Sequence, residues 1–258
     1  ERKLSRHRTR TGHGAARRRP ADDRPAAATL DAEELRARVL HRDPWVIVLD
    51  KPAGLAVHAG PAGGDHLERH LAALAFGYAA PPRAAHRLDR DTSGCLALGR
   101  HRRALKRLGR LFEEKRATKT YWAVVAGVPP AARGRIDRPI AKRTGPAGWR
   151  MVLDDAVGRP AVTDWERLAT DGRRSWLALT PRTGRTHQLR LHVTTLGCAV
   201  VGDGLYAEGE AAAGPLLLHA RALTLPMVAE AAPVHAEAPA PPSLEAAIAA
   251  IRRSDGGG

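Results

Sequence analysis

The order of strand-like and helix-like segments limits the possible folds of this chain more than any other sequence feature. A short β-rich run at residues 45–49 is followed by a turn marked by Pro and Gly, two segments with helical leucine spacing, and four further strand-like runs. These four runs span residues 119–125, 161–168, 175–179 and 216–225. Because strands and helices do not alternate one by one, the pattern argues against a doubly wound parallel sheet. It predicts an α+β domain with a mixed, mostly antiparallel sheet.

Four helices are predicted from capping and leucine spacing. Asp31 stands at the start of the first helix, where its carboxylate can accept hydrogen bonds from free backbone N–H groups. In the longest helix, Leu105, Leu108 and Leu111 recur at helical spacing, with arginine and lysine on the opposite side. The predicted helices span residues 31–38, 65–76, 101–115 and 243–253. The Ala- and Pro-rich stretch 229–242 is expected to be a loop.

The chain carries a large excess of positive charge. Its 258 residues include 42 Lys and Arg against 27 Asp and Glu, which gives a formal net charge of +15. Residues 1–30 are rich in arginine and poor in large apolar side chains, which predicts a disordered basic arm. We expect one folded domain over 31–253 and a flexible glycine tail over 254–258. Since the domain stays basic without the arm, we expect a polyanion such as nucleic acid as the partner.

Two further features bear on the cellular compartment. No run approaches the roughly 18 to 20 apolar residues that span a bilayer, and residues 1–20 are too polar for a signal peptide. Cys95 and Cys198 each lie in an apolar stretch, as buried thiols do in proteins of reducing compartments. We therefore expect a cytoplasmic protein without a membrane partner or a disulfide, and we expect it to be a monomer.

The densest polar segment is residues 86–94, with the sequence His-Arg-Leu-Asp-Arg-Asp-Thr-Ser-Gly. Asp89 and Asp91 are interleaved with Arg87 and Arg90. A neighbouring guanidinium can hold a carboxylate ionised and oriented as a nucleophile. The same spacing also fits a surface turn in which the short polar side chains bond their own backbone. Spacing alone leaves both interpretations open.

A second polar cluster, residues 181–192, follows a strand-like run and is expected to begin a helix. Backbone donors and guanidinium groups converge at such a point, which suits an anion. The cluster lacks the glycine spacing and the terminal Lys-Ser/Thr of a P-loop, which argues against an NTPase of that kind. A basic helix face without a ligand is the alternative.

A metal site is suggested at first by His66 and His70, which stand four residues apart around Glu68. A zinc hydrolase with two helical histidines carries its glutamate directly after the first of them, and here that position is Leu67. We therefore expect two surface histidines and no bound metal.

Five motifs in a fixed order resemble the RluA-type family of pseudouridine synthases. They span residues 51–58, 86–94, 119–127, 183–192 with 196–197 and 202–206, and 218–220. The resemblance implies a pseudouridine synthase catalytic domain with a mixed sheet and a basic RNA-binding cleft. It further implies isomerisation of specific uridines in structured RNA, in 23S rRNA or tRNA, without a cofactor.

The resemblance also implies roles for individual residues. Asp89 matches the essential aspartate of the family, and Arg190 matches the basic residue that pairs with it. Tyr121 matches the tyrosine that stacks on the target base and is a candidate to handle the proton leaving C5. Arg87 matches the residue associated with flipping the nucleotide out of its stack. Further substrate contacts are expected from the second cluster, namely Arg185, Thr186, His187 and Gln188.

Two other classes of protein are alternatives to a pseudouridine synthase. A catalytically silent RNA-binding protein would also suit the net charge of +15. Phosphate binding gives no reason to keep Asp89 in a basic cleft, which argues against that class. A metal-dependent nuclease needs clustered carboxylates or histidines, and the acidic residues near Asp89 are too few to hold two metal ions. Activity that persists in a chelator would separate a synthase from such a nuclease.

Overall fold

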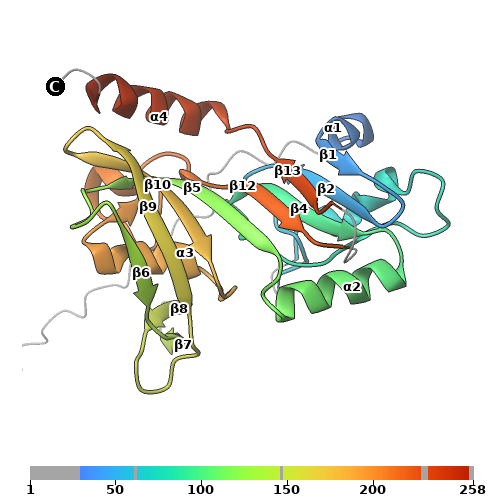
Figure 1. The fold of residues 1–258 in the computed structure, drawn as a ribbon, viewed down its shortest axis with the longest axis horizontal. Coiled ribbons are helices and arrows are strands. Elements are labelled where there is room, and N and C mark those ends of the chain that lie inside the picture. Colours follow the sequence, from blue (N-terminus) through green and yellow to red (C-terminus); the bar gives the residue numbers. More distant parts are fainter. Residues whose placement is uncertain (1–29, 61–62, 146–147, 228–231, 256–258) are drawn as a thin grey trace, which may run out of the picture.

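The computed structural model describes residues 30–60, 63–145, 148–227 and 232–255, and one twisted sheet is its largest feature (Figure 1). The strands are β1 Val39–Arg42, β2 Val46–Lys51, β3 Arg83–Ala84, β4 Ser93–Gly99, β5 Thr118–Ala126, β6 Arg133–Asp137, β7 Ile140–Gly145, β8 Gly148–Leu153, β9 Val162–Thr170, β10 Arg174–Pro181, β11 Ala199–Val200, β12 Leu218–Leu225 and β13 Val234–Glu237. The α-helices are α1 Ala32–Ala37, α2 Arg102–Glu113, α3 Gln188–His192 and α4 Pro242–Asp255. The 3-10 helices are η1 Leu67–Arg69, η2 Leu71–Leu74, η3 Val193–Leu196 and η4 Gly209–Ala212.

The sheet has the strand order β1-β2-β4-β12-β5-β10-β9-β6. Strands β3, β11 and β13 pair beside this path, and β7 and β8 form a separate hairpin. Neighbouring strands are antiparallel except β4 and β12, which pair in parallel. This confirms the predicted α+β class with a mostly antiparallel sheet.

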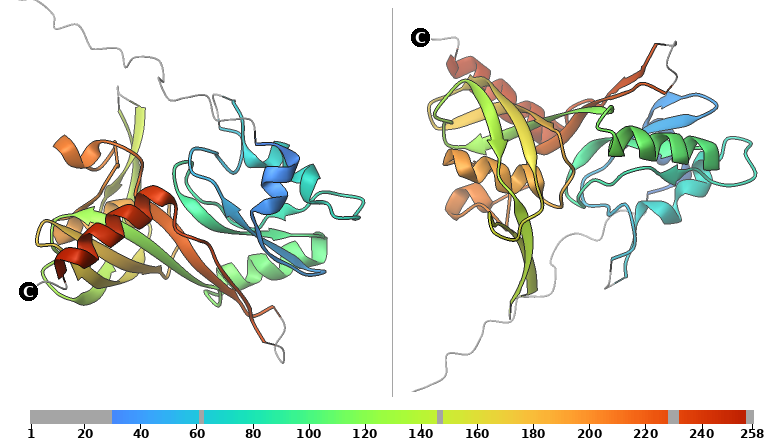
Figure 2. Two further views of the ribbon diagram at one scale, coloured as in Figure 1. Left: turned by 90° about the horizontal axis from the view of Figure 1, so that it is seen from above. Right: turned by 60° about the horizontal axis from the view of Figure 1, so that its bottom comes forward.

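Apolar side chains on both faces place β4 inside the sheet, and all seven of its residues are buried. Leu96 belongs to the core that includes the leucines of α1, η1 and η2, whereas Cys95 packs with apolar residues of α2. Helix α4 covers β5, β9 and β10, with Ile248 in the same cluster as Trp176. Figures 1 and 2 show α2 and α4 on opposite sides of the molecule.

Helix signals near both ends of the domain are confirmed. The Asp31 carboxylate accepts hydrogen bonds from the backbone N–H groups of Glu33 and Glu34, both at 2.8 Å. Helix α4 extends through Ser254 and Asp255, which had been assigned to the glycine tail. The predicted arm up to residue 29 and the last three tail residues lie outside the described part of the chain. No described helix is long and apolar enough to cross a membrane.

The helix predicted for residues 65–76 is wrong in kind. The segment forms two 3-10 helices, η1 and η2, which meet at His70. The N–H groups at its start bond to another part of the chain, since Leu67 N donates to the Ala56 carbonyl at 2.8 Å. A continuous α-helix is not needed for burial, because Leu67, Leu71 and Leu74 all reach the core from the tighter turns.

The expected loop at 229–242 contains a strand, β13, which pairs antiparallel with the second half of β12. The exposed edge of β12 carries free backbone donors and acceptors, and residues 234–237 satisfy them while burying Ala236. Strands β1, β3, β6, β7, β8 and β11 were not predicted either. All are short or lie at an edge, where the hydrophobic alternation is weak.

Candidate active site

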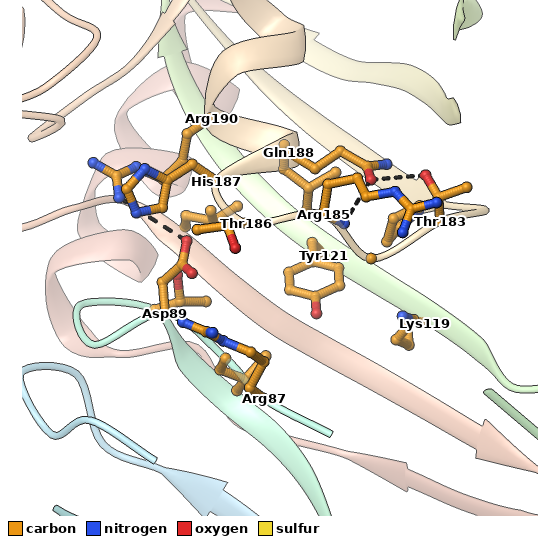
Figure 3. A pocket seen from close by; sticks show the side chains of 16 residues that line it. Arg87, Asp89, Lys119, Tyr121, Thr183, Arg185, Thr186, His187, Gln188 and Arg190 are labelled. Atoms are coloured by element: carbon orange, nitrogen blue, oxygen red, sulfur yellow. Dashed lines mark hydrogen bonds and ion pairs between the residues drawn. The ribbon is translucent and has the colours of Figure 1, made fainter. Parts of the chain in front are cut away.

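A single pocket collects all eight residues predicted for the site (Figure 3). They come from the loop between β3 and β4, from β5, from the segment that joins β10 to α3, and from α3 itself. The full lining is Arg87, Leu88, Asp89, Thr92, Lys119, Tyr121, Pro181, Thr183, Gly184, Arg185, Thr186, His187, Gln188, Leu189, Arg190 and Leu218. Segments about 100 residues apart in the chain meet here. The strand order β4-β12-β5-β10 brings the loop before β4 and the segment after β10 close to β5.

The loop that carries Asp89 is tied to the sheet at several points. The Asp89 carbonyl accepts a hydrogen bond from the Thr92 N–H at 3.1 Å, which closes a backbone turn. Arg90 Nε donates to the Gly54 carbonyl at 2.9 Å. The backbone does turn here, but Thr92 and Ser93 are buried and the Ser93 hydroxyl contacts His219, so this is not the surface turn of the alternative interpretation. The Asp89 side chain, which is 20% exposed, lines the pocket, and among the described residues its ion-pair partner is Arg190.

Lys51 stabilises this loop through hydrogen bonds to backbone carbonyls. Its side chain is fully buried, and Nζ donates to the carbonyls of Pro52, Leu55 and Arg90 at 2.7, 2.8 and 3.1 Å. Burial lowers the pKa of Lys51 to about 7, against the opposing effect of nearby aspartates that include Asp89. The three carbonyls use all the hydrogens of the ammonium group, so Lys51 fixes the backbone beside the Asp89 carboxylate.

The C-terminal end of the loop enters the parallel pairing of β4 with β12. Gly94 has a φ of +105°, and a Cβ at this position would collide with the backbone of Ala220. Glycine is therefore required for the two strands to approach. Beside it, the Ser93 hydroxyl lies 2.8 Å from His219 Nδ1, and His219 Nε2 lies 3.2 Å from the Ala238 carbonyl. This pattern fits a neutral imidazole that donates through Nε2 and accepts through Nδ1.

Acid is expected to weaken the fold through His219. Burial, with a smaller contribution from Arg221, lowers the pKa of His219 to about 4. Between this value and the ordinary one near 6.5, the unfolded chain binds a proton that the folded chain does not. Stability is therefore lost as the pH falls through this range, by about 1.4 kcal/mol per pH unit. Urea unfolding at pH 7 and pH 5 should show a smaller loss for His219→Gln than for the wild type. Equal losses would contradict this assignment.

Arg190 has a nearer partner than the one predicted. Its Nε and Nη2 donate to the two carboxylate oxygens of Asp203 at 2.7 and 2.6 Å, while Nη1 lies 4.0 Å from Asp89 Oδ2. Asp203 is fully buried and also accepts hydrogen bonds from the N–H groups of Leu205 and Tyr206. Burial alone would lower the pKa of Arg190, but the bond to Asp203 outweighs it and raises that pKa. Asp203 thus fixes a permanent cation that faces Asp89.

Tyr121 and Lys119 occupy the wall that β5 contributes (Figure 3). The Tyr121 side chain is largely buried. Burial raises the pKa of its phenol, and the charge of Asp89 raises it further. The phenol is therefore neutral at physiological pH. Burial lowers the pKa of Lys119, whose Nζ lies 5.6 Å from the ring centroid of Phe112 on α2. The pocket thus combines one carboxylate with several cationic groups and a neutral aromatic ring.

His187 stands in a strained position at the start of α3, with a φ of +53°. Its Nδ1 lies 2.9 Å from the Tyr206 hydroxyl, and its ring stacks on Trp149 of β8 with centroids 5.6 Å apart. Burial lowers the pKa of His187, while the charge of Asp89 opposes that shift. The β7–β8 hairpin, which the sequence did not predict, therefore reaches the rim of the pocket.

Gln188 differs from the other predicted substrate contacts because its amide is already occupied. Its Oε1 accepts hydrogen bonds from the Thr183 hydroxyl at 2.7 Å and from the Arg185 N–H at 3.0 Å. Its Nε2 donates to the Val162 carbonyl and the Thr163 hydroxyl, both at 3.0 Å. With its hydrogen-bonding capacity used in this way, Gln188 orders the loop that presents Arg185 to the pocket.

This geometry agrees with what comparison with known proteins shows. The family model described as RNA pseudouridylate synthase matches residues 45–195. The chain belongs to this family. It is an RNA pseudouridine synthase, an isomerase, and the resemblance to the RluA type that the motifs indicated is confirmed.

Relatives of the synthase match over most of the domain. An uncharacterized RNA pseudouridine synthase of Zymomonas mobilis is 45% identical over 210 residues, which cover 80% of this chain and 95% of the relative. Ribosomal large subunit pseudouridine synthase D of the same organism is 29% identical over 202 residues, covering 75% of this chain and 63% of the relative. The solved structure of human RNA pseudouridylate synthase domain containing 4 superposes with a TM-score of 0.73 at 27% identity. That match covers 86% of this chain and 95% of the human one.

Four residues of the synthase site were not singled out from the sequence. They are Lys51, Lys119, Asp203 and Tyr206. Each lies inside one of the five motifs, so the motifs contained a signal. Their roles depend on distances between segments, which a linear motif does not give.

Proposed function

We propose that this synthase converts specific uridines of structured RNA, in 23S rRNA or tRNA, to pseudouridine and that Asp89 is its essential catalytic group. The proposal rests on the surroundings of the Asp89 carboxylate. It lines a pocket, keeps some access to solvent, and lies 4.0 Å from a guanidinium that Asp203 holds in place. A fixed cation at this distance favours the ionised carboxylate, which is the form that a nucleophile requires.

The reaction needs no exchange of electrons with a cofactor. The bond from uridine N1 to the ribose C1′ breaks, the base turns, and a new bond joins C5 to C1′. One proton leaves C5, and N1 of the product carries one proton. A carboxylate that acts on the base or on the sugar carbon, together with groups that hold the base and transfer protons, is sufficient for these steps.

The other residues of the pocket are given roles that follow from their exposure and charge. Arg87 is exposed at the rim, which suits insertion into the RNA when the nucleotide flips. Arg185 and Thr186 can contact the backbone or the ribose of the flipped nucleotide. His187 is held by Tyr206 and Trp149, and we assign it to the same contact surface. The similarity to a ribosomal large subunit synthase supports rRNA among the candidate substrates.

Product mapping tests the proposed function directly. Purified protein is incubated with unmodified transcripts of bacterial 23S rRNA and of tRNA in the presence of EDTA, and pseudouridine is mapped by chemical derivatisation and primer extension. We expect conversion at one or a few defined uridines. RNA from cells with and without the protein should differ at the same positions. Failure to modify either class of RNA would refute the proposed substrates.

Tyr121→Phe is expected to lower the single-turnover rate by about a hundredfold or more, with RNA affinity close to that of the wild type. The substitution removes one oxygen and keeps the ring. The raised pKa of Tyr121 excludes a stable phenolate, but the neutral hydroxyl can relay the proton by accepting it from C5 while its own proton passes toward N1, which carries one in the product. Tyr121→Leu, which also removes the stacking surface, serves as the comparison. A Tyr121→Phe rate within about threefold of the wild type would reduce the role of Tyr121 to stacking.

A further inference from the structure

Helix α2 presents a row of exposed cations that the pocket does not use. Its buried side consists of Ala104, Leu108 and Leu111, which face the sheet. The opposite side carries basic side chains at helical spacing, all of them exposed. They are Arg102, Arg103, Lys106 and Arg110. With a rise of about 1.5 Å per residue, this row extends over about 12 Å of the helix surface.

These four cations have no carboxylate partner within the described part of the chain. Some exposed arginines elsewhere do have one, as Arg135 does with Asp164 at 2.6 Å. On α2, Arg102 and Lys106 are like charges four residues apart, and so are Lys106 and Arg110. Pairs of this kind destabilise a helix.

The charges on α2 also oppose the helix dipole. Arg102 and Arg103 occupy its first turn, which contains no acidic residue, and Glu113 and Glu114 stand at its C-terminal end. Arg110, in the last turn, is the one member of the row that suits the dipole. Two other helices show the favourable order. Helix α1 has two glutamates in its first turn, and α4 has Glu245 in the first turn with arginines in the last. Helix stability therefore gives no reason for Arg102 and Arg103 at the start of α2, whereas an external polyanion does.

The C-terminal end of α2 lies close to the pocket. Phe112, near the C-terminal end of α2, lies under Lys119, which lines the pocket beside Tyr121. From there the basic side chains lead away along the helix.

We propose that the exposed face of α2 formed by Arg102, Arg103, Lys106 and Arg110 binds the phosphate backbone of the RNA that flanks the target uridine. The proposal rests on the proposed function, because it assumes an RNA held in the pocket. The face contacts phosphates and carries no aromatic side chain, so it contributes affinity and orientation without reading bases. Repulsion among these cations lowers the stability of the helix, and contacts with RNA phosphates offset that loss only when RNA is bound.

The test compares two double variants that remove the same charge. Lys106→Gln/Arg110→Gln changes the proposed face and keeps good helix-forming residues. Arg173→Gln/Arg253→Gln removes two exposed cations from the β9–β10 turn and from α4, on the opposite side of the molecule from α2 (Figures 1 and 2). The RNA probes are labelled transcripts of 23S rRNA and tRNA, with affinity measured at several salt concentrations.

For the α2 variant we expect the dissociation constant to rise roughly tenfold and the slope of log affinity against log salt to fall by about one to two. The single-turnover rate at saturating RNA should stay within about twofold of the wild type. The melting temperature should be equal or higher, because a repulsive pair has been removed. The control variant should change affinity by less than about twofold.

Either of two outcomes overturns the proposal. Equal losses in both variants would mean that only the overall charge matters. Unchanged affinity in the α2 variant would mean that this face serves another partner, such as an acidic protein surface. A failure of the proposed function is recognised separately, since the wild type would then bind these transcripts without forming pseudouridine in them.

Discussion

Asp89→Asn is expected to bind RNA nearly as the wild type does and to form product at less than about one per cent of the wild-type rate. The substitution removes the charge of the proposed nucleophile and hardly changes the volume of the side chain. Loss of a covalent catalyst raises the barrier by several kcal/mol, which is more than a hundredfold in rate. The fold should persist, because Arg190 keeps its bidentate partner Asp203.

The control for this prediction is Asp50→Asn. Asp50 lies on β2, next to Lys51 but not in the pocket lining, and its ion pair is with Arg38 at 3.6 Å. This variant removes the same charge from the same half of the domain and should retain most of the activity. Single-turnover rates and RNA affinities are measured for both variants. Turnover by Asp89→Asn above about one per cent of the wild type would remove Asp89 from its proposed role.

Arg190→Met is expected to cost about 3 to 5 kcal/mol of stability in addition to activity. The fully buried Asp203 loses both of its bonds to the guanidinium, and a buried charge without its partner is strongly destabilising. The pairing with Asp89 that the family resemblance implies predicts a loss of rate alone. The geometry predicts both effects, with the larger structural one passing through Asp203.

A second variant separates these two effects. In Arg190→Met/Asp203→Asn, the amide oxygen can still accept the N–H groups of Leu205 and Tyr206, and no buried charge remains. We expect urea unfolding to recover at least half of the lost stability, while the single-turnover rate stays low because Asp89 has no cation beside it. Recovery of the rate together with stability would show that Arg190 acts only on the fold. A stable single variant would contradict the account of Asp203.

Local interactions explain which parts of the fold were predictable. The Asp31 cap and the apolar spacing of α2 act within a few residues, and both were predicted. The segment 65–76 has the same kind of leucine spacing, yet contacts with the chain near Ala56 turned it into 3-10 helices. Strand β13 exists because β12 offers it an edge, which no property of residues 234–237 reveals.

The sequence by itself determined the fold class, the family and eight of the residues that line the pocket. Motif order and the residue types within each motif carry that information, because they can be read along the chain without knowing the distances between packed segments. Tertiary structure alone decided that Arg190 bonds to Asp203 more closely than to Asp89, that Gln188 uses its amide on the protein, and that Lys51 supports the loop that carries Asp89. Such partnerships depend on how distant segments pack, since a buried donor bonds to the acceptor that the sheet brings nearest to it.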